Sequence, residues 1–167
     1  MTGYLVSSSR TVPVELERAF DRVLHEPLPH IFSRRYGPIG AIREVRDQTG
    51  DVWETVGQSR RIVLSDGASM TETLTSVDRP SPDGLLDPPR PGKFGYRIGE
   101  VSGPFKLLIA TLDGEWAFEP AGTGTRITWS WTLHPASSVA AYGLPLFARL
   151  WRGYARQALE EVEKLLV

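Results

Sequence analysis

Residues 125–133, TRITWSWTL, and residues 138–166, SVAAYGLPLFARLWRGYARQALEEVEKLL, are the two stretches that decide the fold. In the first, every second residue is apolar, which is the period of a β-strand with one buried and one wet face. In the second, apolar residues recur every three or four positions from Trp151 to Leu165, which predicts a long amphipathic helix. Pro145, with Gly143 nearby, should kink this helix or delay its start. Together they predict a sheet whose apolar face packs on one long helix.

The rest of the chain adds strands and two short helices. Tyr4–Val12 is a predicted strand, Pro13 opens a helix over residues 13–24, and a second short helix follows near residues 30–35. Further strands, separated by turn signals, are expected at residues 42–46, 52–65, 68–77, 94–101 and 107–118. This order predicts an α+β fold: a curved, seven-stranded antiparallel sheet wrapped around the C-terminal helix, with two short helices after the first strand.

Composition restricts the kind of protein. The chain has 167 residues, 41% hydrophobic and 23% charged, so we expect one globular domain over residues 1–167. Its 19 basic and 20 acidic residues nearly cancel, which argues against nucleic acid as a partner. The chain has no cysteine, so disulfides and thiolate chemistry are excluded. No targeting signal precedes residue 10 and the longest apolar run, residues 139–150, is too short to span a bilayer, so we expect a cytoplasmic protein with no membrane span.

The chain resembles the START-like superfamily, in particular its SRPBCC or polyketide cyclase/dehydrase group in bacteria. The resemblance is carried by motifs spread over nearly the whole sequence, namely VPVE (12–15), VGQSRR (56–61), SDG (65–67), ETL (72–74), FGYRI (94–98), GEWAF (114–118) and GTRITW (124–129). It implies a helix-grip fold with a deep apolar cavity between the sheet and the long helix. It does not imply one function, because the same scaffold serves binders, carriers, cyclases and dehydratases.

Aromatic residues on the facing surfaces of the sheet and helix support such a cavity independently. Ala155 and Ala158 are small residues on the helix stripe, which would leave room for a ligand. The alternative is that the aromatic residues fill the core completely. The expected ligand-binding residues are Val63, Met70, Leu74, Tyr96, Trp116, Phe118, Trp129, Trp131, Leu144, Phe147, Trp151 and Tyr154.

One ion pair is expected on the cavity wall. Asp66-Gly67 is a strong hairpin signal, and a two-residue turn there places Arg61 opposite Glu72. The face that they share also carries apolar residues, so we expect it to point inward and make these two residues the candidates for catalysis. The alternative is an outward face, on which the pair would contribute little.

No motif indicates a metal or another cofactor. The three histidines, His25, His30 and His134, have no partner histidine at helical spacing and no carboxylate on a predicted common face, so we interpret them as loop or surface residues.

Residues 79–93, RPSPDGLLDPPRPGK, hold five prolines and two glycines and form a long loop, where the related proteins usually have a tight connection. Leu85 and Leu86 lie at its centre, and we expect them to dock near the cavity mouth or against a second subunit. The alternative is a solvated, mobile loop without a function.

Two functions remain open after the sequence. The first is a carrier or sensor that binds a lipophilic small molecule, such as a lipid, isoprenoid or polyketide. The second is a cofactor-independent polyketide aromatase/cyclase or dehydratase, which would use the same cavity and the polar groups Arg61, Glu72, Tyr96 or Tyr154. The carrier is favoured because these polar candidates are few. A monomer and a homodimer are both compatible with the sequence.

Overall fold

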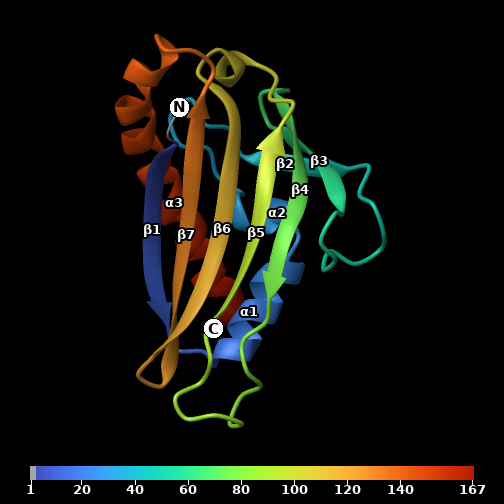
Figure 1. Cartoon of the computed structure of the whole chain (residues 1–167), viewed down its shortest axis with the longest axis vertical. Coiled ribbons are helices and arrows are strands. Elements are labelled where there is room, and N and C mark those ends of the chain that lie inside the picture. Colours follow the sequence, from blue (N-terminus) through green and yellow to red (C-terminus); the bar gives the residue numbers. More distant parts are fainter. Residues whose placement is uncertain (1–2) are drawn as a thin grey trace.

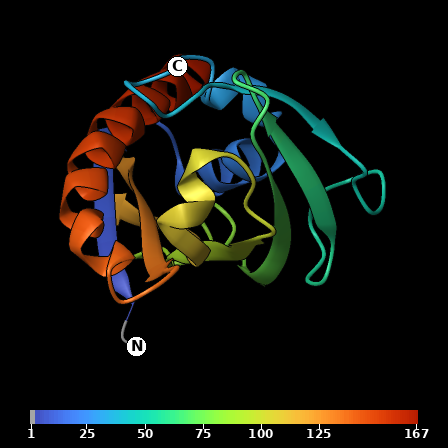
Figure 2. The same cartoon turned by 90° about the horizontal axis from the view of Figure 1, so that it is seen from above.

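One antiparallel sheet curls around the C-terminal helix, as Figures 1 and 2 show. The structure, a computed structural model, describes residues 3–167. The seven strands are β1 (Tyr4–Val12), β2 (Ile42–Arg46), β3 (Ser59–Leu64), β4 (Ser69–Asp78), β5 (Gly92–Gly99), β6 (Ile109–Ala121) and β7 (Gly124–Pro135). Their order in the sheet is β1-β7-β6-β5-β4-β3-β2, so β1 closes one edge by pairing with the last strand. The predicted α+β helix-grip architecture is confirmed.

The long helix α3 (Leu144–Leu166) supplies one side of the core. It starts later than residue 138 because a short 3₁₀ helix, η2 (Ala140–Gly143), precedes it and Pro145 occupies its first turn, as expected for a residue without an N–H. Its predicted apolar stripe is buried, apart from the partly buried Leu165. In residues 3–167, no helix is both long and apolar enough to cross a membrane.

Two short helices cover the concave face of the sheet beside α3. Helix α1 (Leu16–His25) begins three residues after Pro13, not at Pro13 as predicted. Val14 belongs to the turn after β1: its side chain is buried, and its carbonyl accepts a hydrogen bond from Thr125 Oγ1 at 2.7 Å. Helix α2 (Leu28–Ile31) begins two residues before the predicted range, 30–35, and ends at the second residue of that range. Figure 2, seen from above, shows these helices inside the curve of the sheet.

The strand predicted over residues 52–65 is only half present. Residues 52–58 form a loop because the buried side chain of Gln58 bonds its backbone: Oε1 accepts from the N–H of Glu54 and of Thr55, and Nε2 donates to the carbonyl of Val52. These bonds replace the ladder bonds that a strand would make.

The turn between β3 and β4 has three residues, not the predicted two. Ile62 pairs with Met70 and Val63 with Ser69, and Leu64 N–H donates to Ala68 O at 2.8 Å. Gly67 takes the left-handed conformation, with φ of 88°, that such a turn requires. The extra residue changes the partner of every residue on β4 by one position.

The proline-rich connection between β4 and β5 lies at the end of the sheet opposite the 3₁₀ helix η1 (Pro104–Leu107), at the bottom of Figure 1. It is anchored to α1 by a 2.6 Å ion pair between Arg79 and Asp21. Leu85 and Leu86 are 67% and 49% exposed and neither lines the cavity described below, so the prediction that they dock at its mouth is wrong. Their contact with a second subunit stays a prediction.

Candidate functional site

An apolar cavity lies between the concave face of β3–β7 and the short helices, with the first half of α3 closing one side. Its volume is about 80 Å³, less than the roughly 300–1,000 Å³ of sites for drug-sized ligands. On the same scale one water molecule needs about 10–15 Å³, so the space suits a small ligand or one part of a larger one.

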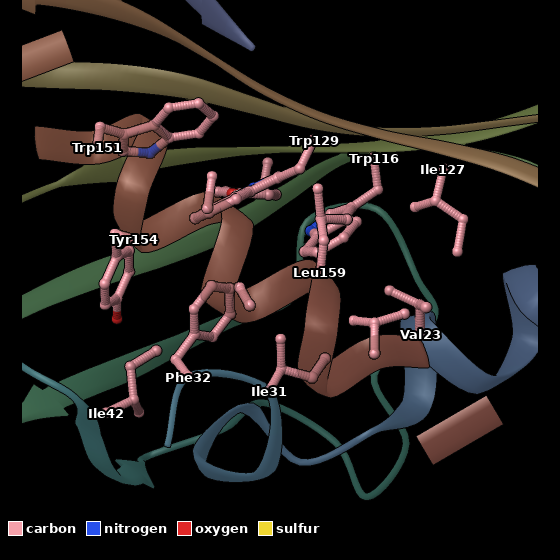
Figure 3. Packing of buried hydrophobic residues seen from close by; sticks show 14 of the residues in the cluster. Val23, Ile31, Phe32, Ile42, Trp116, Ile127, Trp129, Trp151, Tyr154 and Leu159 are labelled. Carbon is pink, nitrogen blue, oxygen red and sulfur yellow. The ribbon is translucent and has the colours of Figure 1, made fainter. Parts of the chain in front are cut away.

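Seven of the twelve residues expected to bind a ligand line this cavity: Met70, Tyr96, Trp116, Trp129, Trp131, Phe147 and Tyr154. Four others, Leu74, Phe118, Leu144 and Trp151, are buried in the core beside it without lining it. Trp151, for example, packs on Trp129 with ring centres 4.8 Å apart (Figure 3). The aromatic residues thus divide between core and cavity wall.

Val63 is placed differently. Its neighbours Ile62 and Leu64 line the cavity, and alternate residues of a strand point to opposite faces. Val63 therefore lies on the convex side of the sheet, and the expectation that it shares the inner face with Met70 is wrong. The three-residue turn shifts the pairing by one position, so that Ile62 and not Val63 lies opposite Met70.

The second wall of the cavity comes from residues that sequence reasoning missed. This wall includes Val23, Leu24 and Ile31 from α1 and α2, Phe32 just after α2, and Ile42 at the start of β2. Phe32 lies against both Trp129 and Tyr154, with ring centres 5.1 and 5.7 Å away (Figure 3). Their apolar character was visible in the sequence, but nothing local indicated that this segment folds over the sheet.

The mouth of the cavity lies beside η1. Five lining residues are partly exposed: Met70, Val101 and Phe105 lie at this end, Trp131 packs on Phe147 next to it, and Leu28 lies apart on α2. Phe105 packs edge-on against Phe147 of α3, with ring centres 5.3 Å apart. Figure 2 shows η1 inside the curve of the sheet. We expect a ligand to enter at this end, past the Phe105 ring.

A buried ion pair lies on the polar part of the wall. Arg60 Nε donates to Glu72 Oε2 at 2.6 Å, and both side chains line the cavity. The guanidinium carbon of Arg60 also lies 3.9 Å from the ring centre of Trp53, in the loop before β3, which adds a cation–π contact. The predicted partner was Arg61, and this is wrong: Arg61 lies opposite Thr71, faces the other side of the sheet and donates to Ser69 Oγ at 2.9 Å.

Tyr96 is the second polar group of the cavity. Its hydroxyl oxygen accepts hydrogen bonds from Trp129 Nε1 at 2.7 Å and from Trp131 Nε1 at 2.8 Å. Burial, and then the nearby carboxylate of Glu72, raise the pKa of Tyr96, so the phenol stays protonated. The ring is seated over Gly114 on β6, its partner across the strands, where no side chain occupies the space.

Tyr154, the other predicted tyrosine, has its hydroxyl occupied. It donates to the carbonyl of Gly40 at 3.1 Å. Burial raises the pKa of Tyr154 as well. This side chain therefore contributes its ring to the cavity, while its polar atom stabilises the segment before β2.

The histidines do meet carboxylates, contrary to the expectation from sequence. His30 Nδ1 lies 2.7 Å from Glu26, His134 Nε2 lies 2.9 Å from Asp113, and His25 lies 3.7 Å from Glu54. Each of these carboxylates also pairs with an arginine, and none of the three histidines lines the cavity. Within residues 3–167, no cluster of three or more histidine, aspartate or glutamate side chains is arranged to hold a metal ion.

Comparisons with solved structures show the same fold in distant proteins. Ginseng major latex-like protein 151 from Panax ginseng superposes with a TM-score of 0.63 at 11% identity, covering 100% of this chain and 99% of its own. The protein TTHA0849 from Thermus thermophilus gives 0.60 at 16% identity, with 98% and 97% covered. DynU16, from the dynemicin biosynthetic locus, gives 0.57 at 14% identity, with 97% of this chain but 46% of its own covered. At these identities the likeness shows the fold alone.

Among curated protein sequences, none is similar enough to count as a relative. A family profile, in contrast, matches residues 5–167, which is nearly the whole chain. Its description is "Polyketide cyclase / dehydrase and lipid transport". With the curled sheet, the gripping helix and the motifs quoted above, this match shows that the chain belongs to the polyketide cyclase/dehydrase and lipid transport family, within the START-like (SRPBCC) superfamily.

Proposed function

We propose that this protein binds a small lipophilic molecule in the cavity between sheet and helices, as a carrier or sensor. The observation that carries the proposal is a largely apolar cavity whose lining residues beside η1 are partly exposed. An apolar ligand gains roughly 25 cal/mol for each Å² of its surface that leaves water, and this lining offers such a surface. The small volume favours a compact ligand, or one whose remainder stays at the mouth.

The carrier is preferred because most polar groups of the cavity already form an ion pair or a hydrogen bond within the protein. Arg60 and Glu72 neutralise one another, and the Tyr154 hydroxyl is bonded to Gly40. One observation favours the second candidate, a cyclase or dehydratase: the Tyr96 hydroxyl lies in the cavity as a protonated group that could serve as a general acid. Turnover of a model β-polyketone by the wild type and not by Tyr96→Phe would support that alternative.

Binding of the neutral fluorescent probe N-phenyl-1-naphthylamine tests the proposal. We expect saturable binding at one site per chain. Val101→Trp places an indole in the mouth and should weaken binding at least about tenfold, a difference of about 1.4 kcal/mol. Val139→Trp is the matched control, because Val139 is 80% exposed and does not line the cavity. Absence of saturable binding to the wild type, or equal binding by both variants, would contradict the proposal.

A further inference from the structure

The hydroxyl hydrogen of Tyr96 finds no acceptor among residues 3–167. An indole N–H can only donate, so both bonds from Trp129 and Trp131 end on the Tyr96 oxygen and use its lone pairs. The phenol must therefore direct its own hydrogen elsewhere. In the part of the chain that the structure describes, no acceptor lies within hydrogen-bonding distance of it, although the residue is only 6% exposed and lines the cavity.

A buried donor without a partner is unfavourable by about 1–3 kcal/mol, so a ligand that brings an acceptor to this hydroxyl would be stabilised. The ring cannot turn away easily, because it lies over Gly114 and its oxygen is held by two indoles. Two fixed donors on the oxygen thus orient the phenol as a preorganised donor toward the cavity, and preorganised donors lose little entropy when a ligand binds.

The charges beside Tyr96 restrict the ligand further. Glu72 is close enough to raise the pKa of Tyr96, and Arg60 opposes this effect to a smaller extent. Arg60 is already paired with Glu72 and stacked on Trp53, so among the described residues no free cation faces the cavity from this wall. A ligand carboxylate placed at Tyr96 would find no free cation to pair with, because the charge of Arg60 is already used by Glu72, whereas a neutral oxygen needs none.

We propose that the cavity selects neutral ligands that carry a carbonyl oxygen on an apolar body, such as a ketone, ester or quinone, and that the Tyr96 hydroxyl donates the hydrogen bond that holds this oxygen. The inference rests on the proposed function, since it names the ligand class of the same cavity. It assigns Tyr96 a direct contact with the ligand and gives Trp129 and Trp131 the role of positioning the phenol.

Three probes of similar shape test the inference. 2-Acetylnaphthalene carries the carbonyl, 2-isopropenylnaphthalene replaces the oxygen by a CH₂ group, and 2-naphthoate replaces the methyl ketone by a carboxylate. One net hydrogen bond is worth about 0.5–1.5 kcal/mol, so the ketone should bind about three- to tenfold more tightly than the alkene, and the carboxylate least tightly. Quenching of tryptophan fluorescence can report binding, because Trp116, Trp129 and Trp131 line the cavity.

Tyr96→Phe should remove the preference for the ketone while retaining affinity for the alkene. Tyr142→Phe is the control, because it removes a tyrosine hydroxyl from a side chain that is 87% exposed and does not line the cavity; its preference should equal that of the wild type. Tyr96→Phe leaves two indole N–H groups without an acceptor, so a measurement on the wild type accompanies it. The C=O stretch of bound 2-acetylnaphthalene should lie at lower frequency than in hexane.

The outcomes separate the two proposals. If neither neutral probe binds the wild type, the proposed function fails. If both bind with equal affinity, or the bound ketone keeps its hexane frequency, the cavity binds ligands but Tyr96 does not select them, and only the inference is overturned. Tighter binding of 2-naphthoate than of the ketone would likewise overturn the choice of a neutral ligand.

Discussion

The carboxylate of Glu72 lies 2.6 Å from Arg60 Nε, on neighbouring strands of the concave face, and neither side chain is more than 8% exposed. Removing one member of such a pair leaves the other charge buried without compensation, which commonly costs about 3–5 kcal/mol. The pair is therefore a sensitive reporter of the β3–β4 register.

Arg60→Met should lower the free energy of unfolding by about 3–5 kcal/mol, because Glu72 would lose its charge partner in an apolar wall. Arg61→Met is the matched control: it lies on the other face and is partly exposed, so we expect a loss of no more than about 1 kcal/mol. Urea denaturation of both variants gives the comparison. The double variant Arg60→Met/Glu72→Leu should recover much of the loss, and equal effects of the two single variants would mean that the register is different.

Gly114→Ala should displace the Tyr96 ring. A Cβ at position 114 would overlap the ring carbon that bears the hydroxyl, far inside contact distance. We expect a loss of at least about 2 kcal/mol, from overpacking and from the bonds to the two indoles, together with a changed tryptophan fluorescence spectrum. Gly99→Ala on β5 serves as the control, because a Cβ there meets nothing within 4 Å. A Gly114→Ala protein with wild-type stability and spectrum would show that the ring has space elsewhere.

Phe105→Ala should open the mouth of the cavity. Because the Phe105 ring packs against Phe147 at the partly exposed end, its removal should raise both the association and the dissociation rate of N-phenyl-1-naphthylamine, severalfold each. Leu107→Ala, a neighbouring residue of η1 that is 75% exposed, should leave both rates unchanged. Stopped-flow fluorescence measures them directly, and unchanged rates in the Phe105 variant would place the entrance elsewhere.

Acid should destabilise the protein partly through Glu26. Desolvation at this buried position opposes ionisation, but hydrogen bonds from His30 and Arg22 outweigh it, and the pKa of Glu26 is lowered below its ordinary value. A lowered folded-state pKa adds stability that is present above the unfolded-state pKa near 4.5 and is lost as the pH falls through the folded-state pKa.

Glu26→Gln should therefore flatten the fall in unfolding free energy below about pH 5 and lower the stability at pH 7. Glu15→Gln removes the same charge from an exposed side chain that caps no helix N–H, and should change the stability at pH 7 by no more than about 0.5 kcal/mol. Thermal unfolding across pH 3–7 provides the curves; parallel acid limbs in wild type and Glu26→Gln would contradict the role assigned to Glu26.

Much of the fold could be predicted because its signals are local. The alternation of residues 125–133 and the apolar stripe of α3 each repeat within a few residues, and the delaying effect of Pro145 follows from its missing N–H. Local signals fail at residues 52–58, where a strand was predicted. The sequence there is strand-like, but the side chain of Gln58 forms hydrogen bonds with the backbone of this segment and stabilises it as a loop.

The sequence by itself determined the order of the elements, the apolar faces of β7 and α3, and the presence of Glu72 on the inner face of β4. The tertiary structure decided which groups meet. Because the turn has one extra residue, Arg60 and not Arg61 lies opposite Glu72 on the inner face. A shift of one residue reverses the face of every side chain on a strand. Likewise, contact between Tyr96 and two indoles depends on the pairing of β5, β6 and β7, and the wall that carries Phe32 depends on how α1 and α2 fold back. Such contacts join residues far apart in the chain, and no periodicity within one segment encodes them.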